Sequence, residues 1–124
     1  MTGDDVARIL TVMWPDAAER ERAHAELSRY GTEVHEREAD RVRLAMLKLS
    51  SGRFERLAEM VVAAKRDYRD VLMWAESPAE GQALWAVRPN LSVHERAELE
   101  KRRTEDRKQY QEWLTHPGRR PPRR

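Results

Sequence analysis

Apolar residues recur every three or four positions along most of the chain, which is the spacing of one face of an α-helix. The pattern is most regular over 53–76, where steps of three and four alternate without interruption. The residues of this stripe, called the seam below, are Phe54, Leu57, Val61, Ala64, Tyr68, Val71 and Ala75. We expect one continuous helix over 53–76, with Ala58, Val62 and Leu72 widening a seam that other helices cover.

The segment 33–50 is expected to be a second long helix that folds back on 53–76. Its second half, VRLAMLKLS, is apolar on two sides, as in a helix packed between neighbours. Gly52 lies in the short SSG link and suits a helix end, so the two helices should run antiparallel. This hairpin is predicted to form the centre of the fold.

Two shorter helices are predicted before the hairpin. Residues 4–14 and 17–30 both have apolar positions at helical spacing, and Pro15 separates them. Gly31 is a suitable stop for the second helix.

A long polar helix is predicted near the carboxyl end. Ser92 and Glu95 have the spacing of a capping box, which marks the start of a helix over 93–115. Its middle, residues 100–109, contains no apolar side chain, so only its two ends are expected to pack. Such a helix bridges solvent or lies against another subunit.

The connector 77–91 contains two prolines and a glycine and is expected to hold at most one short helical turn. One tryptophan, Trp74, precedes it and another, Trp85, lies within it. Trp74 and Trp85 either pack on the bundle or form an exposed anchor for a partner. Because an aromatic residue beside an apolar stripe usually belongs to the core, we expect burial.

The predicted fold class is therefore all-α: a small helical bundle built on an antiparallel helical hairpin. We divide the chain into a bundle over 1–91, a long C-terminal helix over 92–116, and a basic Arg/Pro tail over 117–124 of the disordered type.

Composition narrows the classes of function. The chain has no cysteine, which excludes disulfides, thiol catalysis and zinc sites with cysteine ligands. It shows neither a signal-peptide pattern nor a long apolar run, so we expect a cytoplasmic protein with no membrane span. The 20 arginines against 4 lysines fit a GC-rich bacterial genome, so the total arginine content carries little information.

Candidate chemistry is sparse. The charged run KRDYRD (65–70) surrounds Tyr68, but Tyr68 falls on the seam, and we interpret the run as the flank of a packed helix with an Arg66–Asp70 pair. His35 with Glu38, or His94 with Glu98, supplies only two ligands, and no metal or cofactor is expected. The sequence has no catalytic motif, and we expect a non-enzymatic protein. A carboxylate–histidine site of His35 with Asp67 or Asp70 is the remaining catalytic possibility.

Basic charge is concentrated at the carboxyl end. Residues 101–124 contain 9 basic and 3 acidic side chains, and arginine presents a planar fork suited to phosphates and carboxylates. The tail is either a solvated terminus or an arm for nucleic acid or an acidic protein surface. The possible nucleic-acid contacts are Arg102, Arg103, Arg107, Lys108, Arg119, Arg120, Arg123 and Arg124.

The runs RLAMLKLSSGRFERL and AKRDYRDVLMWAE, followed by Pro78, resemble a group of small uncharacterised bacterial proteins with a similar helical hairpin. The likeness covers about residues 30–80. It implies a bacterial origin and an independent helical domain, and it assigns no activity.

These features favour a protein–protein interaction or adaptor protein, acting as a homodimer or as a subunit of a larger assembly. The thin core and the bare middle of the last helix are the basis for this hypothesis. The possible partner contacts are Trp85, Tyr110, Trp113 and Leu114. The alternative is a nucleic-acid-associated protein that uses 101–124 as a cationic arm.

Overall fold

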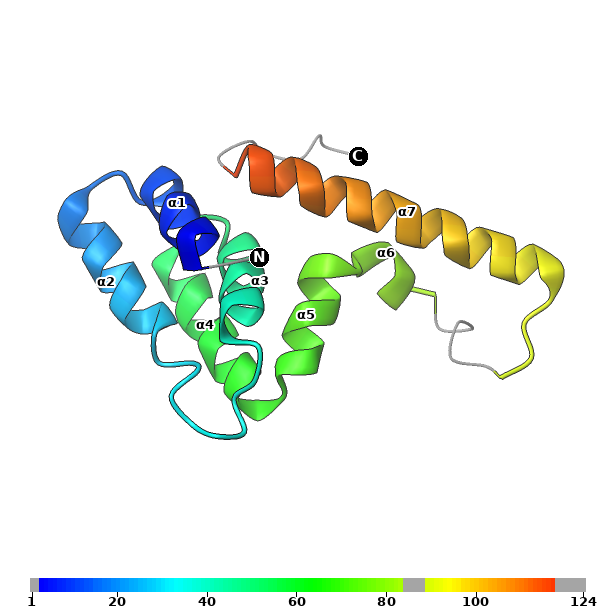
Figure 1. Cartoon of the computed structure of the whole chain (residues 1–124), viewed down its shortest axis with the longest axis horizontal. Coiled ribbons are helices and arrows are strands. Elements are labelled where there is room, and N and C mark those ends of the chain that lie inside the picture. The colour runs from blue at the N-terminus through cyan, green and yellow to red at the C-terminus, as the bar shows by residue number, and fades with distance from the viewer. Residues whose placement is uncertain (1–2, 84–88, 118–124) are drawn as a thin grey trace.

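The computed structural model describes residues 3–83 and 89–117, and every regular element within them is a helix. The predicted all-α class is thus confirmed, and the described helices pack as a bundle with a long final helix across it (Figure 1). Their bounds are α1 Gly3–Met13, α2 Ala17–Leu27, α3 Ala39–Ser50, α4 Phe54–Arg66, α5 Tyr68–Glu76, α6 Pro78–Gly81 and α7 Val93–Thr115. None of these helices combines the length and apolar character needed to cross a bilayer.

The centre of the core is α3, as its two-sided apolar pattern predicts. Val42 and the run Leu44–Leu47 are fully buried, because α3 packs against α1, α4 and α5 at once. After α3 the chain reverses through Ser51 and Gly52, which both have left-handed backbone conformations (φ 52° and 77°). Glycine adopts this conformation without steric cost, and α4 then lies beside α3.

The predicted helix over 33–50 is wrong in its first third. Residues 33–38 form a loop, and α3 begins only at Ala39. The loop is held by the Glu36 carboxylate, which accepts hydrogen bonds from the backbone of residues 31–33. Glu38, immediately before α3, has φ 51°, so a right-handed helix cannot run through it. The helix predicted over 17–30 likewise ends early, at Leu27.

The continuous helix predicted over 53–76 is also wrong, because the chain breaks at Asp67. This residue is extended (φ −158°, ψ 103°) and separates α4 from α5. Its carboxylate accepts the Arg69 backbone N–H at 3.1 Å, the geometry of a helix N-cap. The break lets α5 pack on both α3 and α4.

The seam nevertheless continues through the break. Five of its members are buried in the core, and Phe54 and Tyr68 are half-buried. Leu72 widens this buried face as expected, whereas Val62 does not, since 55% of its surface is exposed.

The burial predicted for Trp74 is also wrong, because 47% of its surface is exposed. The face that α5 turns inward consists of Val71, Leu72 and Ala75. At about 100° per residue Trp74 projects about 60° beyond Val71, at the edge of this face, and is left half-exposed. Trp85 lies outside the described residues.

The last helix starts at the predicted capping box: the Glu95 N–H donates to Ser92 Oγ at 3.1 Å and the Ser92 N–H donates to Glu95 Oε1 at 3.2 Å. Its middle, however, is not bare. Asp106 is only 4% exposed and faces α6, so α7 packs at its centre through polar groups and not only at its ends. Figure 1 shows α7 running across α5 and α6 toward α1.

Candidate functional site

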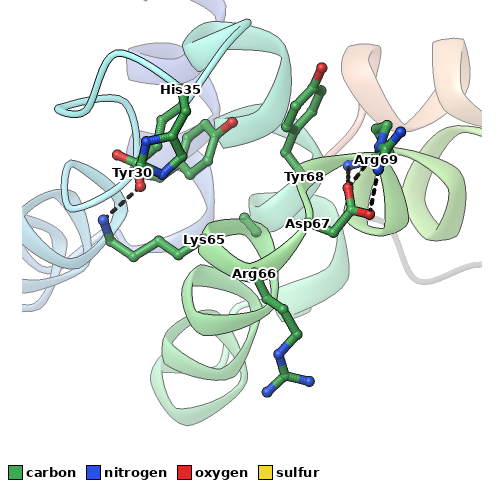
Figure 2. Close-up of a pocket in the computed structure, with 9 residues that line it drawn as sticks. Tyr30, His35, Lys65, Arg66, Asp67, Tyr68 and Arg69 are labelled. Atoms are coloured by element: carbon green, nitrogen blue, oxygen red, sulfur yellow. Dashed lines mark hydrogen bonds and ion pairs between the residues drawn. The ribbon is translucent and has the colours of Figure 1, made fainter.

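The charged run 65–70 and His35 meet at an open depression of about 270 Å³ between the loop after α2 and the break at Asp67 (Figure 2). This is the arrangement that the sequence offers only as a remaining catalytic possibility, although Asp70 does not line it. The lining residues are Tyr30, His35, Glu36, Ala64, Lys65, Arg66, Asp67, Tyr68 and Arg69.

Glu36 is a buried residue that lines this depression and holds the loop after α2. Its Oε1 accepts three backbone N–H groups, those of Gly31, Thr32 and Glu33, at 3.1–3.2 Å, and its Oε2 accepts Lys65 Nζ at 2.7 Å. Burial opposes ionisation, but the hydrogen bonds from Lys65 and the backbone outweigh it and lower the pKa of Glu36 to about 2. A carboxylate so fully occupied holds the loop and is a poor proton acceptor.

Tyr30 is also committed to the fold. Its ring is fully buried, and its hydroxyl donates to the Arg37 carbonyl at 2.8 Å. Burial, followed by the nearby Glu36 charge, raises the pKa of Tyr30 to about 12. The hydroxyl therefore keeps its proton at neutral pH and acts as a fixed hydrogen-bond donor.

On the opposite side, Asp67 pairs with Arg69 through two contacts of 3.0 Å. Hydrogen bonds from the Arg69 side chain and backbone hold the pKa of Asp67 below its ordinary value. The expected Arg66–Asp70 pair is wrong: among the described residues the ion pairs of this run join Lys65 to Glu36 and Asp67 to Arg69. The Arg66 side chain points away from the depression (Figure 2).

Most of the charged side chains that line the depression are therefore paired with one another. Both carboxylates, Glu36 and Asp67, are bound to cations of the same chain. His35 lies at the exposed rim, and neither carboxylate orients its ring, as a general base would require. The geometry therefore favours a structural role for the run 65–70.

Metal ligation finds no support in the described part of the chain, where no three His, Asp or Glu side chains come together in a way that could hold an ion. His35 with Glu38, and His94 with Glu98, remain the two-ligand sets that the sequence indicates.

A different feature is prominent on α5. Met73 and Trp74, adjacent in sequence, are 52% and 47% exposed and form what we call the outer face of α5. Met73 is not among the candidate residues that the sequence predicts. The sequence does hold a signal for Met73, because it falls off the seam on the side of the helix opposite Val71, Leu72 and Ala75, and a residue there is expected to face outward.

The partner contacts predicted on α7 face this chain itself. Tyr110 is buried. The centroid of its ring lies 5.6 Å from the ring centroid of Trp113 and 5.4 Å from Lys48 Nζ. Burial raises the pKa of Tyr110. Trp113 and Leu114 are half-buried against the core. Most of this surface is thus already used within the chain.

The cations predicted to contact nucleic acid are largely engaged as well. Arg102 donates to the Ala79 carbonyl at 3.0 Å, Arg103 binds Glu80 at 3.0 Å, and Arg107 lies 3.6 Å from Glu100. Lys108 is exposed. The remaining predicted contacts lie outside the described residues: Arg119, Arg120, Arg123 and Arg124.

Comparison with known proteins gives no relative: no protein-family model matches the chain, and no curated protein or solved structure matches it either. The resemblance to small bacterial helical proteins stays a prediction.

Proposed function

We propose that this protein is a non-enzymatic interaction protein, an adaptor or assembly subunit, that binds a protein partner through the outer face of α5. The observation that carries the proposal is the half-exposed Trp74 beside the half-exposed Met73. The absence of cysteine fits a partner met in a reducing compartment such as the cytoplasm.

Tryptophan and methionine are enriched in the centres of protein interfaces, where a few large side chains carry most of the binding energy. The other exposed apolar side chains that stand alone, such as Val12 and Val34, are single valines, and scattered valines of this kind are normal on a protein surface. On α5 the two large residues are neighbours. Asp70, one turn earlier and exposed, supplies a polar edge to the same face.

Replacing Trp74 with Ala is expected to weaken partner binding by at least about tenfold, because truncating a hot-spot aromatic typically costs about 2 kcal/mol or more. The measurement is affinity capture with the whole chain, followed by titration of the purified partner. Val12→Ala is the matched control, since Val12 is also about half-exposed (46%) but lies on α1, away from α5 (Figure 1). Equal binding by the Trp74→Ala variant and the native chain would exclude the outer face of α5.

The alternative, a nucleic-acid-associated protein, now rests mainly on the tail, because Arg102, Arg103 and Arg107 of α7 contact carboxylates or carbonyls of the same chain. It is supported by the excess of basic residues over 101–124. If it holds, binding to single-stranded or duplex nucleic acid is expected to fall steeply with salt and to drop when 117–124 are deleted, with the helical content unchanged. No binding at low salt would eliminate this alternative.

A further inference from the structure

The break at Asp67 lacks the usual causes of a helix break. No proline or glycine lies in AAKRDYRDVLMWAE, and these residues account for most sharp breaks. The seam also keeps its three-four spacing from Ala64 through Tyr68 to Val71, so the apolar pattern fits a continuous helix as well as a broken one.

One side chain stabilises the broken form locally. The Asp67 carboxylate caps α5 and binds the Arg69 guanidinium. The Arg69 side chain is largely in solvent, and the Asp67 side chain is partly exposed. A continuous helix would replace these contacts with backbone hydrogen bonds from residues 68–70 to residues 64–66. The two local conformations therefore differ little in hydrogen bonding, and the packing of α5 on α3 and α4 decides between them.

Straightening the segment in a single chain would uncover the inner face of α5, namely Val71, Leu72 and Ala75, which are all buried. A second copy removes this cost. If two chains straighten and exchange α5–α7, each α5 packs on the α3 and α4 of the other chain with the same contacts that it makes in the monomer. Only the hinge residues then differ between the two forms, and exchange across a short hinge is a low-cost route to a dimer.

From this balance we infer that the chain forms a homodimer by exchanging α5–α7, with residues 54–76 straightening into one helix at Asp67. The partner is a second copy of the same chain, and the surface that it fills is the groove on α3 and α4 that α5 occupies in the monomer. Exchange leaves Met73 and Trp74 on the outward side of α5, so this inference does not rest on the proposed partner contact.

The test compares Tyr68→Pro with Tyr68→Ala in the full chain. Both variants remove the same half-buried ring. Proline suits the first position of α5, and the extended conformation of Asp67 is the one that a residue before proline prefers. Within a continuous helix, however, proline is strongly unfavourable. Light scattering after incubation at high concentration is expected to show dimers for Tyr68→Ala and monomers for Tyr68→Pro.

A second pair of variants keeps the inference testable if either of these folds poorly. Asp67→Ala removes the cap and improves helix propensity. Each change favours the straight hinge, and together they shift the equilibrium between broken and straight forms by about tenfold per hinge. Because the dimer contains two hinges, its dissociation constant is expected to fall roughly 100-fold. Asp70→Ala serves as the control: it gains the same propensity, and in the first turn of α5 it loses only an acidic side chain whose interaction with the helix N-terminus is weaker than a cap. Its effect on dimerisation is therefore expected to be clearly smaller. Equal dimerisation by the proline and alanine variants at 68, equal effects of the alanine variants at 67 and 70, or a monomeric Asp67→Ala chain at every concentration would overturn the exchange.

Discussion

Glu36→Ala is expected to lower the free energy of unfolding by about 3 kcal/mol, because it leaves three loop N–H groups and Lys65 without their shared acceptor. Glu36 is only 7% exposed, so water does not easily take its place. Denaturant unfolding of the native chain and the variant measures the loss. Glu33→Ala, three residues away with an exposed side chain, is the control and is expected to change stability by less than about 0.5 kcal/mol.

The same carboxylate is expected to make the stability of the protein depend on pH. The pKa of Glu36 falls from its ordinary 4.5 to about 2 on folding, so its ionisation stabilises the native state above about pH 4.5, and this contribution is lost as the pH falls toward 2. Allowing for solvent at the open rim of the depression, we expect the ionisation of Glu36 to contribute about 2 kcal/mol to the free energy of unfolding. The stability gap between the native chain and Glu36→Gln should therefore narrow between pH 5 and 2.5, and a gap independent of pH would contradict this role.

Asp106→Ala is the second large effect, with an expected loss of about 2–3 kcal/mol. The buried carboxylate accepts the N–H groups of Ala79 and Glu80, both at 3.0 Å, and so caps α6 from a distant helix. Its removal leaves both donors unpaired. Hydrogen exchange should accelerate at these two amides in particular, and denaturant unfolding should report the overall loss.

The neighbouring Glu105 provides the control, because its side chain is exposed and projects about 100° around α7 from Asp106. Glu105→Ala is expected to leave both the amide exchange and the stability nearly unchanged. If Asp106→Ala and Glu105→Ala behaved alike, the polar contact between α6 and α7 would not be what holds the middle of α7.

Much of the fold could be predicted from local pattern. The capping box at Ser92 and the two-sided apolar face of α3 depend on residues close in sequence, and both are present as expected. The break at Asp67 was harder to foresee, because the packing of α5 on α3 decides it and the seam is compatible with either form. An aspartate followed by an acidic residue three positions later, as in Asp67 and Asp70, resembles a helix start and was an available signal.

The errors elsewhere have a common physical cause. Glu36 and Asp106 looked like ordinary surface charges, yet each is buried as an acceptor for backbone N–H groups. Polarity alone predicts exposure, and only the folded chain shows which carboxylates find enough donors to be buried. The candidate site changed because Lys65, Asp67 and Arg69 of the charged run are paired within the chain, whereas Trp74 is half-exposed.

Photo-cross-linking from position 74 in cells that produce the protein naturally tests the central claim most directly. With a photoreactive residue in place of Trp74, we expect one or a few cross-linked species of defined mass, which identify the partner. The same residue at position 12 should give none of them. Cross-linking at position 74 no different from that at position 12 would show that the outer face of α5 meets only solvent, and it would contradict the proposed interaction role.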